Sequence, residues 1–235
     1  MLLRVPLDGA AAVISAGHGT SFAIMQDSGS LFAWGHCASG SLGLGAALMT
    51  QDCACPTIVP NITEASFIAA GPQHTAVCCS DGRYRAMRPV VLTDGCENKI
   101  HRLYTTGQNP AGELGVQHGA SVNGCSEFQL VVGSGQGADC VASTVSCGAS
   151  HTICIDASGQ LWGCGSNLNG QLGLANRNAF MPFQVLPLPE PASQIAAAGR
   201  HTLVLGTSGF VWWLGEGKKG NHYSKEIILL PELWP

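Results

Sequence analysis

The sequence predicts an all-β fold built from about four copies of one repeated unit, with residues 1–235 forming a single domain. Composition supports this prediction, since hydrophobic residues make up 46% of the chain, charged residues only 11%, and glycine occurs 31 times. Such a chain is too apolar to be disordered and can bury a core. The glycines follow no collagen-like period, and they lie between short apolar runs, as expected for strands joined by tight turns.

Internal repetition is the second observation that predicts the fold. The copies cover residues of about 13–60, 67–132, 145–188 and 195–230, and an insertion at 83–102 interrupts the second copy. Each copy contains an apolar β run, a glycine-containing turn and a returning run with an aromatic side chain. A single hairpin is marginally stable in water, so the copies are expected to stack on one another.

Aligned positions of the four copies, here called columns, recur at matching spacings. The first column contains Ser21, His74, His151 and His201. The turn column contains Gly29, Gly82, Gly159 and Gly209. The aromatic column contains Phe32, Tyr104, Trp162 and Trp212, and the column three residues later contains Gly35, Gly107, Gly165 and Gly215. Hairpins that repeat with a period near 50 residues predict a propeller, in which each copy forms one blade.

One motif in these copies resembles a known repeat. The pattern is Gly-x-x-His-Thr, a turn glycine, then aromatic-x-x-Gly-x-Asn-x-x-Gly-Gln-Leu-Gly, and residues 148–174 match it almost residue for residue. It is similar to the repeat of the regulator of chromosome condensation (RCC1) family. The resemblance implies an RCC1-like β-propeller. Members usually have seven blades, so we expect a partial or degenerate propeller. The chain is then a fragment of a larger propeller, an open fan, or a unit completed by blades of another chain or by self-association.

The column histidines His74, His151 and His201 are predicted to be structural. A catalytic residue is needed once, whereas a residue present in every copy serves the repeat itself. We therefore expect buried imidazoles that bond to the backbone and fix each blade. No catalytic residue and no cofactor is predicted.

A metal site is the alternative explanation for one group of residues. Cys147, His151 and Cys154 have a spacing that resembles half of a zinc site. However, Cys147 shares its column with alanines and Cys154 shares its column with valines. Cysteines that act as small core hydrophobes explain both positions, so no metal is expected.

The insertion at 83–102 is the feature that the repeat does not explain. Its positive side chains are Arg83, Arg85, Arg88, Lys99 and Arg102. With two acidic residues in the same segment, its net charge is +3, which leaves −7 for the rest of a chain whose total is −4. Long loops on rigid scaffolds often carry function, so we predict that this segment contacts a partner. The alternative is a solvated excursion without a role.

Charge and hydropathy limit the classes of function that the chain can have. A net charge of −4 and a pI near 6 give no indication of nucleic-acid binding. The sequence contains no run of 18 apolar residues, so we expect no membrane span. Asp8 interrupts the opening segment, so we expect no signal peptide and an intracellular location, in cytoplasm or nucleus. The predicted function is a protein-interaction module or scaffold. The resemblance implies the alternative, guanine-nucleotide exchange on a small GTPase, which requires no covalent chemistry by the chain itself.

Overall fold

The computed structural model describes residues 4–37, 39–48, 52–81, 100–116, 124–131, 142–216 and 228–229. Within these ranges the structure has sixteen strands and one short 3-10 helix, at Ala46–Leu48. The strands form four antiparallel four-stranded sheets, and each sheet is a meander of four consecutive strands. The predicted all-β propeller architecture is therefore confirmed, and each sheet is called a blade below.

The blades follow one another along the chain. Blade 1 contains β1 (Ala11–Ala16), β2 (Thr20–Met25), β3 (Leu31–Gly35) and β4 (Cys53–Ile58). Blade 2 contains β5 (Ala65–Ala70), β6 (His74–Asp81), β7 (Ile100–Gly107) and β8 (Cys125–Leu130). Blade 3 contains β9 (Ala142–Cys147), β10 (His151–Asp156), β11 (Leu161–Gly165) and β12 (Met181–Val185). Blade 4 contains β13 (Ala192–Ala198), β14 (His201–Gly206), β15 (Val211–Gly215) and β16 (Ile228–Leu229).

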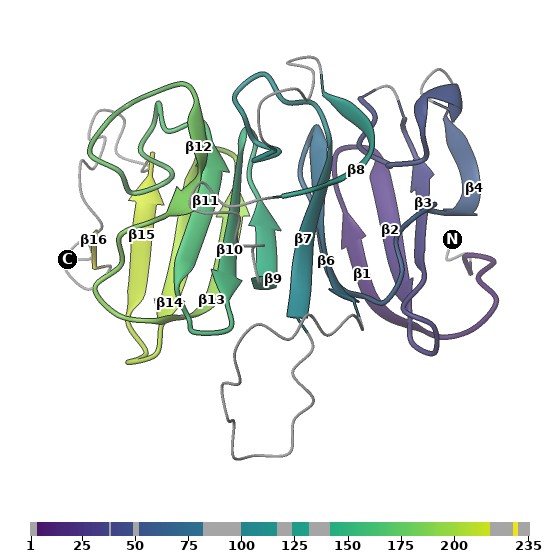
Figure 1. Cartoon of the computed structure of the whole chain (residues 1–235), viewed down its shortest axis with the longest axis horizontal. Coiled ribbons are helices and arrows are strands. Elements are labelled where there is room, and N and C mark those ends of the chain that lie inside the picture. Colours follow the sequence, from purple (N-terminus) through teal and green to yellow (C-terminus); the bar gives the residue numbers. More distant parts are fainter. Residues whose placement is uncertain are drawn as a thin grey trace.

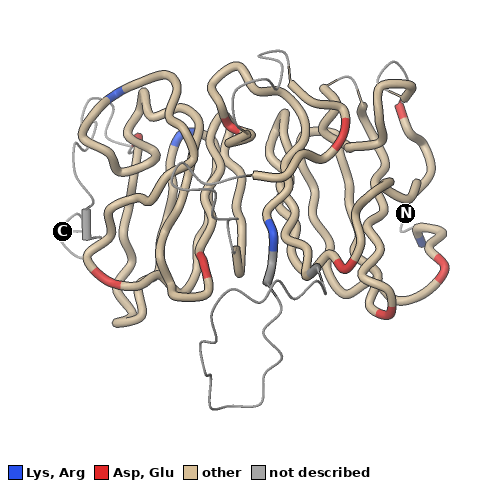
Figure 2. The backbone as a smooth tube through the Cα atoms, in the orientation of Figure 1, with Lys and Arg blue, Asp and Glu red and all other residues tan. Residues whose placement is uncertain are grey.

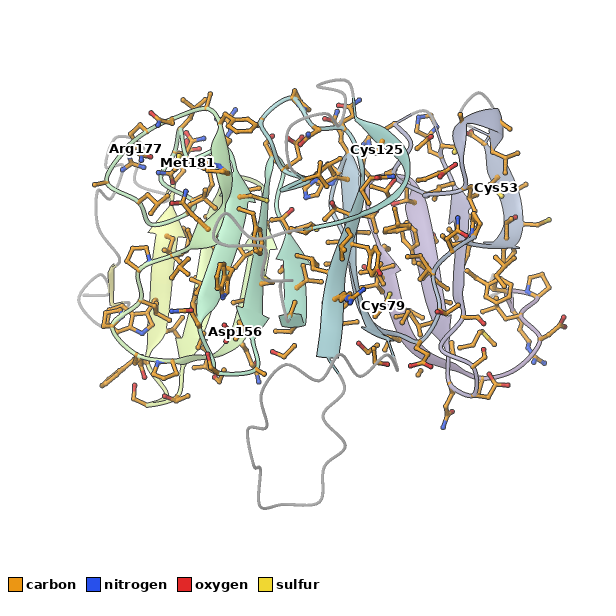
Figure 3. All side chains as sticks on the ribbon, viewed as in Figure 1. Cys53, Cys79, Cys125, Asp156, Arg177 and Met181 are labelled. Atoms are coloured by element: carbon orange, nitrogen blue, oxygen red, sulfur yellow. The ribbon has the colours of Figure 1, made fainter. Side chains whose placement is uncertain are left out.

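The four blades stand side by side, with blade 1 at the N-terminal end of the row and blade 4 at the C-terminal end (Figure 1). Cys53, Cys125 and Met181 begin the fourth strands of their blades, and all three lie at one edge of the row, called the upper edge (Figure 3). Asp156, at the end of β10, lies at the opposite, lower edge. Loops that join third and fourth strands therefore lie along the upper edge, and turns between second and third strands lie along the lower edge.

The core lies between the blades. Phe22, Ile24 and Leu31 of blade 1 pack against Ile68 and Val77 of blade 2. Equivalent clusters join blade 2 to blade 3 and blade 3 to blade 4. The first strands of neighbouring blades are also bonded, since the amides of Ala70 and Ala197 donate to the hydroxyls of Ser15 and Ser146. No blade buries its apolar faces alone, which is why the unit must be repeated.

Glycines hold the sharp bends that the repeat requires. Gly159 and Gly209 have φ of 82° and 89° in the lower-edge turns, a left-handed conformation that favours glycine. Gly165 has φ of 99°, and a Cβ there would lie 2.5 Å from the carbonyl oxygen of Ser150. The same approach recurs at Gly215, where a Cβ would lie 2.4 Å from the carbonyl oxygen of Arg200. These columns therefore reflect backbone geometry.

The second copy corrects one sequence prediction. We expected a turn at residues 80–82 and a returning strand from Leu103. Instead, β6 continues to Asp81, which pairs with Ile100, so β7 begins three residues earlier. Arg102 is therefore part of β7, opposite Cys79, and does not belong to a loop. Gly82, Arg83, Arg85, Arg88 and Lys99 lie outside the described residues.

The first copy contains a second correction. Strand pairing places His74, His151 and His201 opposite Gly107, Gly165 and Gly215, and in blade 1 the residue opposite Gly35 is Thr20. Ser21 is therefore in the column of the threonines that follow the histidines, and our alignment was wrong by one residue. The length of the turn explains the error. Six residues separate the paired Ile24 and Leu31 in blade 1, whereas five separate the paired Ile155 and Leu161 in blade 3.

Candidate functional site: the joints between blades and the loop edges

Two column histidines connect one blade to the next. The Nε2 atom of His74 in blade 2 lies 2.9 Å from the hydroxyl oxygen of Thr152 in blade 3. The Nε2 atom of His151 in blade 3 lies at the same distance, 2.9 Å, from the hydroxyl oxygen of Thr202 in blade 4. All four side chains are fully buried. We expected bonds to the backbone, and the structure adds a threonine hydroxyl of the next blade as the partner of each Nε2 atom. The third column histidine, His201, is half-buried and not buried as we expected.

Each of these threonines is held from two sides. The Thr152 hydroxyl donates to the carbonyl oxygen of Glu113 at 2.6 Å, and the Thr202 hydroxyl donates to that of Gln171 at 3.0 Å. Glu113 and Gln171 belong to the upper-edge loops of blades 2 and 3, the same blades that supply the histidines. We call this arrangement, a histidine and a loop carbonyl of one blade around a threonine of the next, the clamp.

The clamp determines which ring nitrogen of the imidazole carries a proton. A hydroxyl has one hydrogen, and Thr152 gives it to Glu113, so His74 must be the donor through Nε2–H. Burial lowers the pKa of His74 to about 4, so the ring is neutral at neutral pH. Burial likewise lowers the pKa of His151 to about 3, and the nearby His74 and His201 add to that effect.

The joint between blades 1 and 2 lacks this bond. Thr20 stands in the histidine column, and Thr75 is the threonine that such a histidine would reach. Both hydroxyls are buried, and neither has a hydrogen-bond partner. The described residues thus form two complete clamps, and the joint between blades 1 and 2 relies on its apolar cluster.

The upper-edge loops are built to present the clamp carbonyl. Asn109 and Asn167 accept hydrogen bonds from the amides of Leu114 and Leu172, each at 3.0 Å, and so close each loop on itself. The Glu113 carboxylate accepts from the amide of Ala111 at 2.8 Å, as Gln171 does from Asn169 at 3.0 Å. Burial raises the pKa of the Glu113 carboxyl. The ionisable Glu113 of blade 2 therefore occupies the position that the neutral Gln171 has in blade 3.

Tryptophans of the aromatic column are tied to acids of the lower edge. The indole N–H of Trp162 donates to Asp156 at 2.9 Å, and its ring stacks on Phe183 with centroids 5.7 Å apart. The indole N–H of Trp212 donates to Glu190, also at 2.9 Å. These acids therefore orient side chains of the repeat.

The cysteines of the alternative metal site lie in the core. Cys147 and Cys154 belong to the apolar cluster between blades 2 and 3. Burial raises the pKa of the Cys147 thiol to about 12, so it is not a thiolate at neutral pH. Among the described residues, no group of three His, Cys, Asp or Glu side chains is arranged to hold a metal ion.

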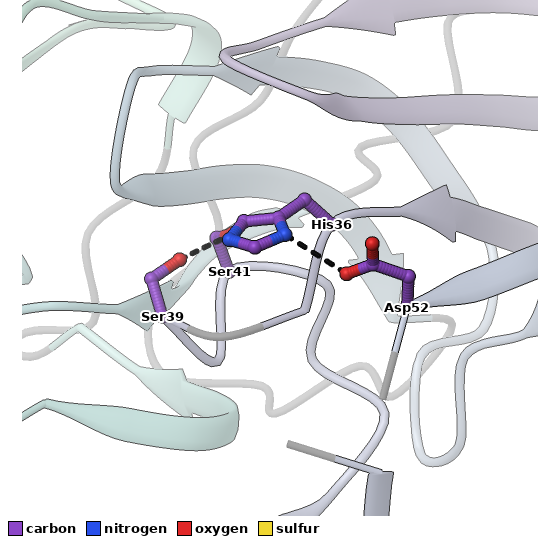
Figure 4. A network of polar contacts seen from close by, with 4 residues as sticks. All are labelled: His36, Ser39, Ser41 and Asp52. Atoms are coloured by element: carbon purple, nitrogen blue, oxygen red, sulfur yellow. Dashed lines mark hydrogen bonds and ion pairs between the residues drawn. The ribbon is translucent and has the colours of Figure 1, made fainter. Parts of the chain in front are cut away.

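One polar group on the upper edge of blade 1 has the residue types of a catalytic triad. His36 Nδ1 lies 2.8 Å from Asp52 Oδ1, and the hydroxyls of Ser39 and Ser41 lie 2.8 Å apart beside it (Figure 4). The His36 and Asp52 side chains are 56% and 72% exposed. An exposed pair of this kind is an ordinary surface hydrogen bond, and the serine bond joins the two serines to each other.

Acidic residues lie along both edges of the row of blades within the described residues (Figure 2). Asp156, at the end of β10, is at the lower edge, whereas Glu113 belongs to an upper-edge loop. The ends of β6 and β7 that flank the basic insertion lie at the lower edge. Four of its five predicted contact residues lie outside the described residues, and Arg102 is half-buried in β7. Within the described ranges, no helix is long and apolar enough to cross a membrane.

Comparison with protein-family models identifies the repeats. Two models described as "Regulator of chromosome condensation (RCC1) repeat" match the chain, one at residues 142–171 and the other at residues 28–78 and 158–205. These ranges contain the clamp residues of blade 3 and the threonine of blade 4. The chain belongs to the RCC1-repeat family.

Curated relatives of this RCC1-repeat chain include nucleotide exchange factors. It is 30% identical over 195 residues to the bovine (Bos taurus) secretion-regulating guanine nucleotide exchange factor, an alignment of 80% of this chain and 35% of that protein. It is 28% identical over 199 residues to the mouse (Mus musculus) regulator of chromosome condensation, covering 83% of this chain and 39% of that one. The chain thus spans well under half the length of these relatives.

Solved structures share the fold of the RCC1-repeat chain. Yeast RCC1 (Prp20) bound to Kap60 superposes with a TM-score of 0.71 at 16% identity, over 95% of this chain and 47% of that one. Human WBSCR16 superposes with a TM-score of 0.73 at 16% identity, over 97% of this chain and 55% of that one. At this identity the likeness concerns the fold alone.

Sequence reasoning missed the partners in the clamp. A signal for them exists, because the RCC1-type motif places a threonine directly after each histidine. Successive residues of a strand point to opposite faces. A histidine that faces the following blade must therefore precede a threonine that faces the preceding one, and the two halves of the joint can be matched from one blade to the next.

Proposed function

We propose that this chain is a protein-interaction module, whose blades hold loops for recognition at the two edges. The clamp supports this proposal most directly, since the repeated histidines and threonines are engaged in holding blades together. The upper-edge loops, in contrast, present apolar side chains to solvent, with Leu168 54% and Phe180 50% exposed. Buried apolar anchors surrounded by polar groups are the usual centres of protein interfaces.

The basic insertion is the second part of the proposed contact surface. It joins β6 to β7, whose paired ends Asp81 and Ile100 lie at the lower edge. A net charge of +3, in a chain whose remainder carries −7, favours an acidic partner and acts mainly on the rate of association. The pairing of Asp81 with Ile100 fixes where the insertion joins blade 2, which supports a role in positioning that charge.

Guanine-nucleotide exchange on a small GTPase is the second candidate function. It is favoured by the names of the relatives, of which the bovine exchange factor aligns with 80% of this chain. Exchange requires a rigid surface that stabilises the GTPase without its nucleotide. Such an activity needs only binding energy, which is compatible with an interaction module.

Purified small GTPases loaded with a fluorescent GDP analogue test the two functions together. If the chain is an exchange factor, it accelerates release of the analogue from one GTPase and binds that GTPase more tightly without nucleotide. If it is an interaction module only, release rates do not change. Affinity purification with the same chain then identifies the proteins that it binds.

Charge reversal tests the role of the insertion in either case. Arg85→Glu with Arg88→Glu is expected to slow association with the captured partner several-fold, and raised salt is expected to have the same effect on the native chain. Arg4→Glu is the control, because Arg4 is exposed and lies outside both the insertion and the upper-edge loops. Equal binding of the insertion variant and the native chain would contradict the proposed contact.

A further inference from the structure

Two large apolar side chains of the upper-edge loop of blade 3, residues 166–180, face solvent. Leu168 is 54% exposed and Phe180 is 50% exposed, whereas Leu172 of the same loop is fully buried. We call Leu168 and Phe180 the apolar pair. Single exposed apolar residues are ordinary on protein surfaces, so the pair indicates a binding site only if its surroundings also favour one.

The loop that carries the apolar pair is held by one buried residue. The backbone amide of Asn167 donates to the carbonyl oxygen of Asn178 at 2.9 Å, and its side-chain amide donates to that of Leu174 at 3.1 Å. The Asn167 side chain is fully buried. Leu168 follows Asn167 directly, and Phe180 comes two residues after Asn178, so the backbone next to both members of the pair is fixed.

The ring of Phe180 also lies against the loop of blade 2. It occupies the space in which a Cβ of Gly112 would lie, so a larger residue at that position would clash with it. The ring therefore belongs to one loop and rests on the next, while half of its surface faces solvent. An aromatic side chain that is already ordered loses little conformational entropy on binding, which makes it a good anchor for a partner.

The charges near the apolar pair are mainly positive among the described residues. Arg177 lies at the upper edge (Figure 3), and its guanidinium occupies the space in which a Cβ of Gly170 would lie, in the same loop. Arg200, in the first turn of blade 4, has a side chain that is 66% exposed and pairs with Glu216 at 3.6 Å. The acid of the blade 2 loop, Glu113, is only 1% exposed. A partner with negative charge therefore suits this part of the edge.

We propose that this part of the upper edge binds a peptide segment of a partner protein in which a large apolar side chain stands next to an acidic residue. The apolar side chain covers Leu168 and Phe180, and the carboxylate approaches Arg177. This partner class presupposes the interaction module proposed above. The contact lies at the edge opposite to the basic insertion, so the two contacts can be tested independently.

Selection from a phage-displayed library of short random peptides, with the full chain as target, tests the proposal. Enriched peptides are expected to carry a large apolar residue beside Asp or Glu. Fluorescence anisotropy of a labelled synthetic copy then measures its Kd for the native chain and the variants. Phe180→Asp and Leu168→Asp are each expected to weaken binding by at least about tenfold, because each places a charge in the apolar contact. Arg177→Gln is expected to weaken binding less and to reduce its dependence on salt.

Phe210→Asp is the matched control, since Phe210 is 48% exposed but belongs to the lower-edge turn between β14 and β15. This variant is expected to bind the peptide as the native chain does. Circular dichroism shows which variants are folded, and Leu168→Asp keeps the test valid if Phe180→Asp is not. A selection that enriches no such peptide, or a peptide that folded Phe180→Asp and Leu168→Asp bind as tightly as the native chain, would overturn the proposal.

The same variants separate this contact from the interaction module itself. If a captured protein partner is lost with Arg85→Glu and Arg88→Glu but still binds Phe180→Asp, the module stands and the upper-edge contact is wrong. If neither a protein partner nor a peptide binds the native chain, the interaction module is wrong as well.

Discussion

Individual polar residues determine how the blades of this RCC1-repeat chain meet. The structural role of His74 and His151 could be predicted because both recur at one position of the repeat. Their partners Thr152 and Thr202 could not, because the contact joins residues of different copies and depends on the direction in which each side chain points. The alignment error at Ser21 has a local cause, because the turn of blade 1 contains one more residue than the turn of blade 3. Ser21 lies eight residues before its turn glycine, as the histidines do, so the spacing in the sequence did not reveal the additional residue.

Valine substitutions compare a complete clamp with the incomplete joint. Thr152→Val leaves the buried Nε2–H of His74 without an acceptor, so we expect a loss of about 1–3 kcal/mol in the free energy of unfolding. Thr75→Val removes a buried hydroxyl that has no partner, and is expected to be neutral or stabilising. Urea denaturation of both variants and the native chain measures the difference. Equal losses in the two variants would mean that the hydrogen bond contributes nothing.

At the scale of elements, hairpin geometry was predictable and strand ends were less so. Glycine columns indicated the turns at Gly159 and Gly209, where the structure has positive φ. In blade 2, Ser80, Asp81 and Gly82 resemble a turn in composition, yet the ladder of β6 and β7 continues through Asp81. Main-chain pairing added several residues to both strands there, and it is independent of the side-chain pattern on which the prediction relied.

The extended ladder allows the insertion to be removed cleanly. Replacing residues 82–99 by Asn-Gly, a favoured two-residue hairpin turn, keeps the pair Asp81 and Ile100. We expect the free energy of unfolding to stay the same or to rise by up to about 2 kcal/mol, because a shorter loop loses less entropy on closing. Thermal unfolding followed by circular dichroism measures it. A large loss of stability would show that the segment packs on the blades.

At the scale of the whole molecule, the number of repeats predicted the number of blades. The exposure of Ile14, Leu203 and Leu205 in the first and fourth blades could not be predicted, since these residues have the same residue types as buried positions. Only their place at the ends of the row distinguishes them. Stability in such an array is approximately a sum of blade terms and nearest-neighbour joints, so the clamps contribute at each joint that contains one.

The buried histidines make the stability of the array depend on pH. Their pKa values of about 4 and about 3 lie below the ordinary value of 6.5, so the unfolded chain binds more protons. The contribution of the histidines to stability is therefore complete above pH 6.5 and falls as the pH decreases toward these values, by about 1.4 kcal/mol per unit for each histidine. The raised pKa of Glu113 acts in the opposite direction, since protonation of this buried carboxyl favours the folded state.

Denaturation at pH 7 and pH 5 measures this dependence, and the expected result is a clear loss of stability at the lower pH. A His36→Gln variant is the control, because His36 is exposed at the upper edge and is no part of a clamp. It should retain the full loss, whereas His151→Gln should show less of it. Equal stability of the native chain at the two pH values would contradict the buried, neutral imidazoles.

The direction of the clamp has a consequence for how such a protein can change over generations. Every blade with the full motif brings one histidine for the blade after it and one threonine for the blade before it. A duplicated segment of the gene therefore arrives with both halves of a working contact, and a lost segment leaves its two neighbours able to meet each other. Blade number can then vary in a lineage without the invention of a new interface, provided that the ring or row can accommodate the change.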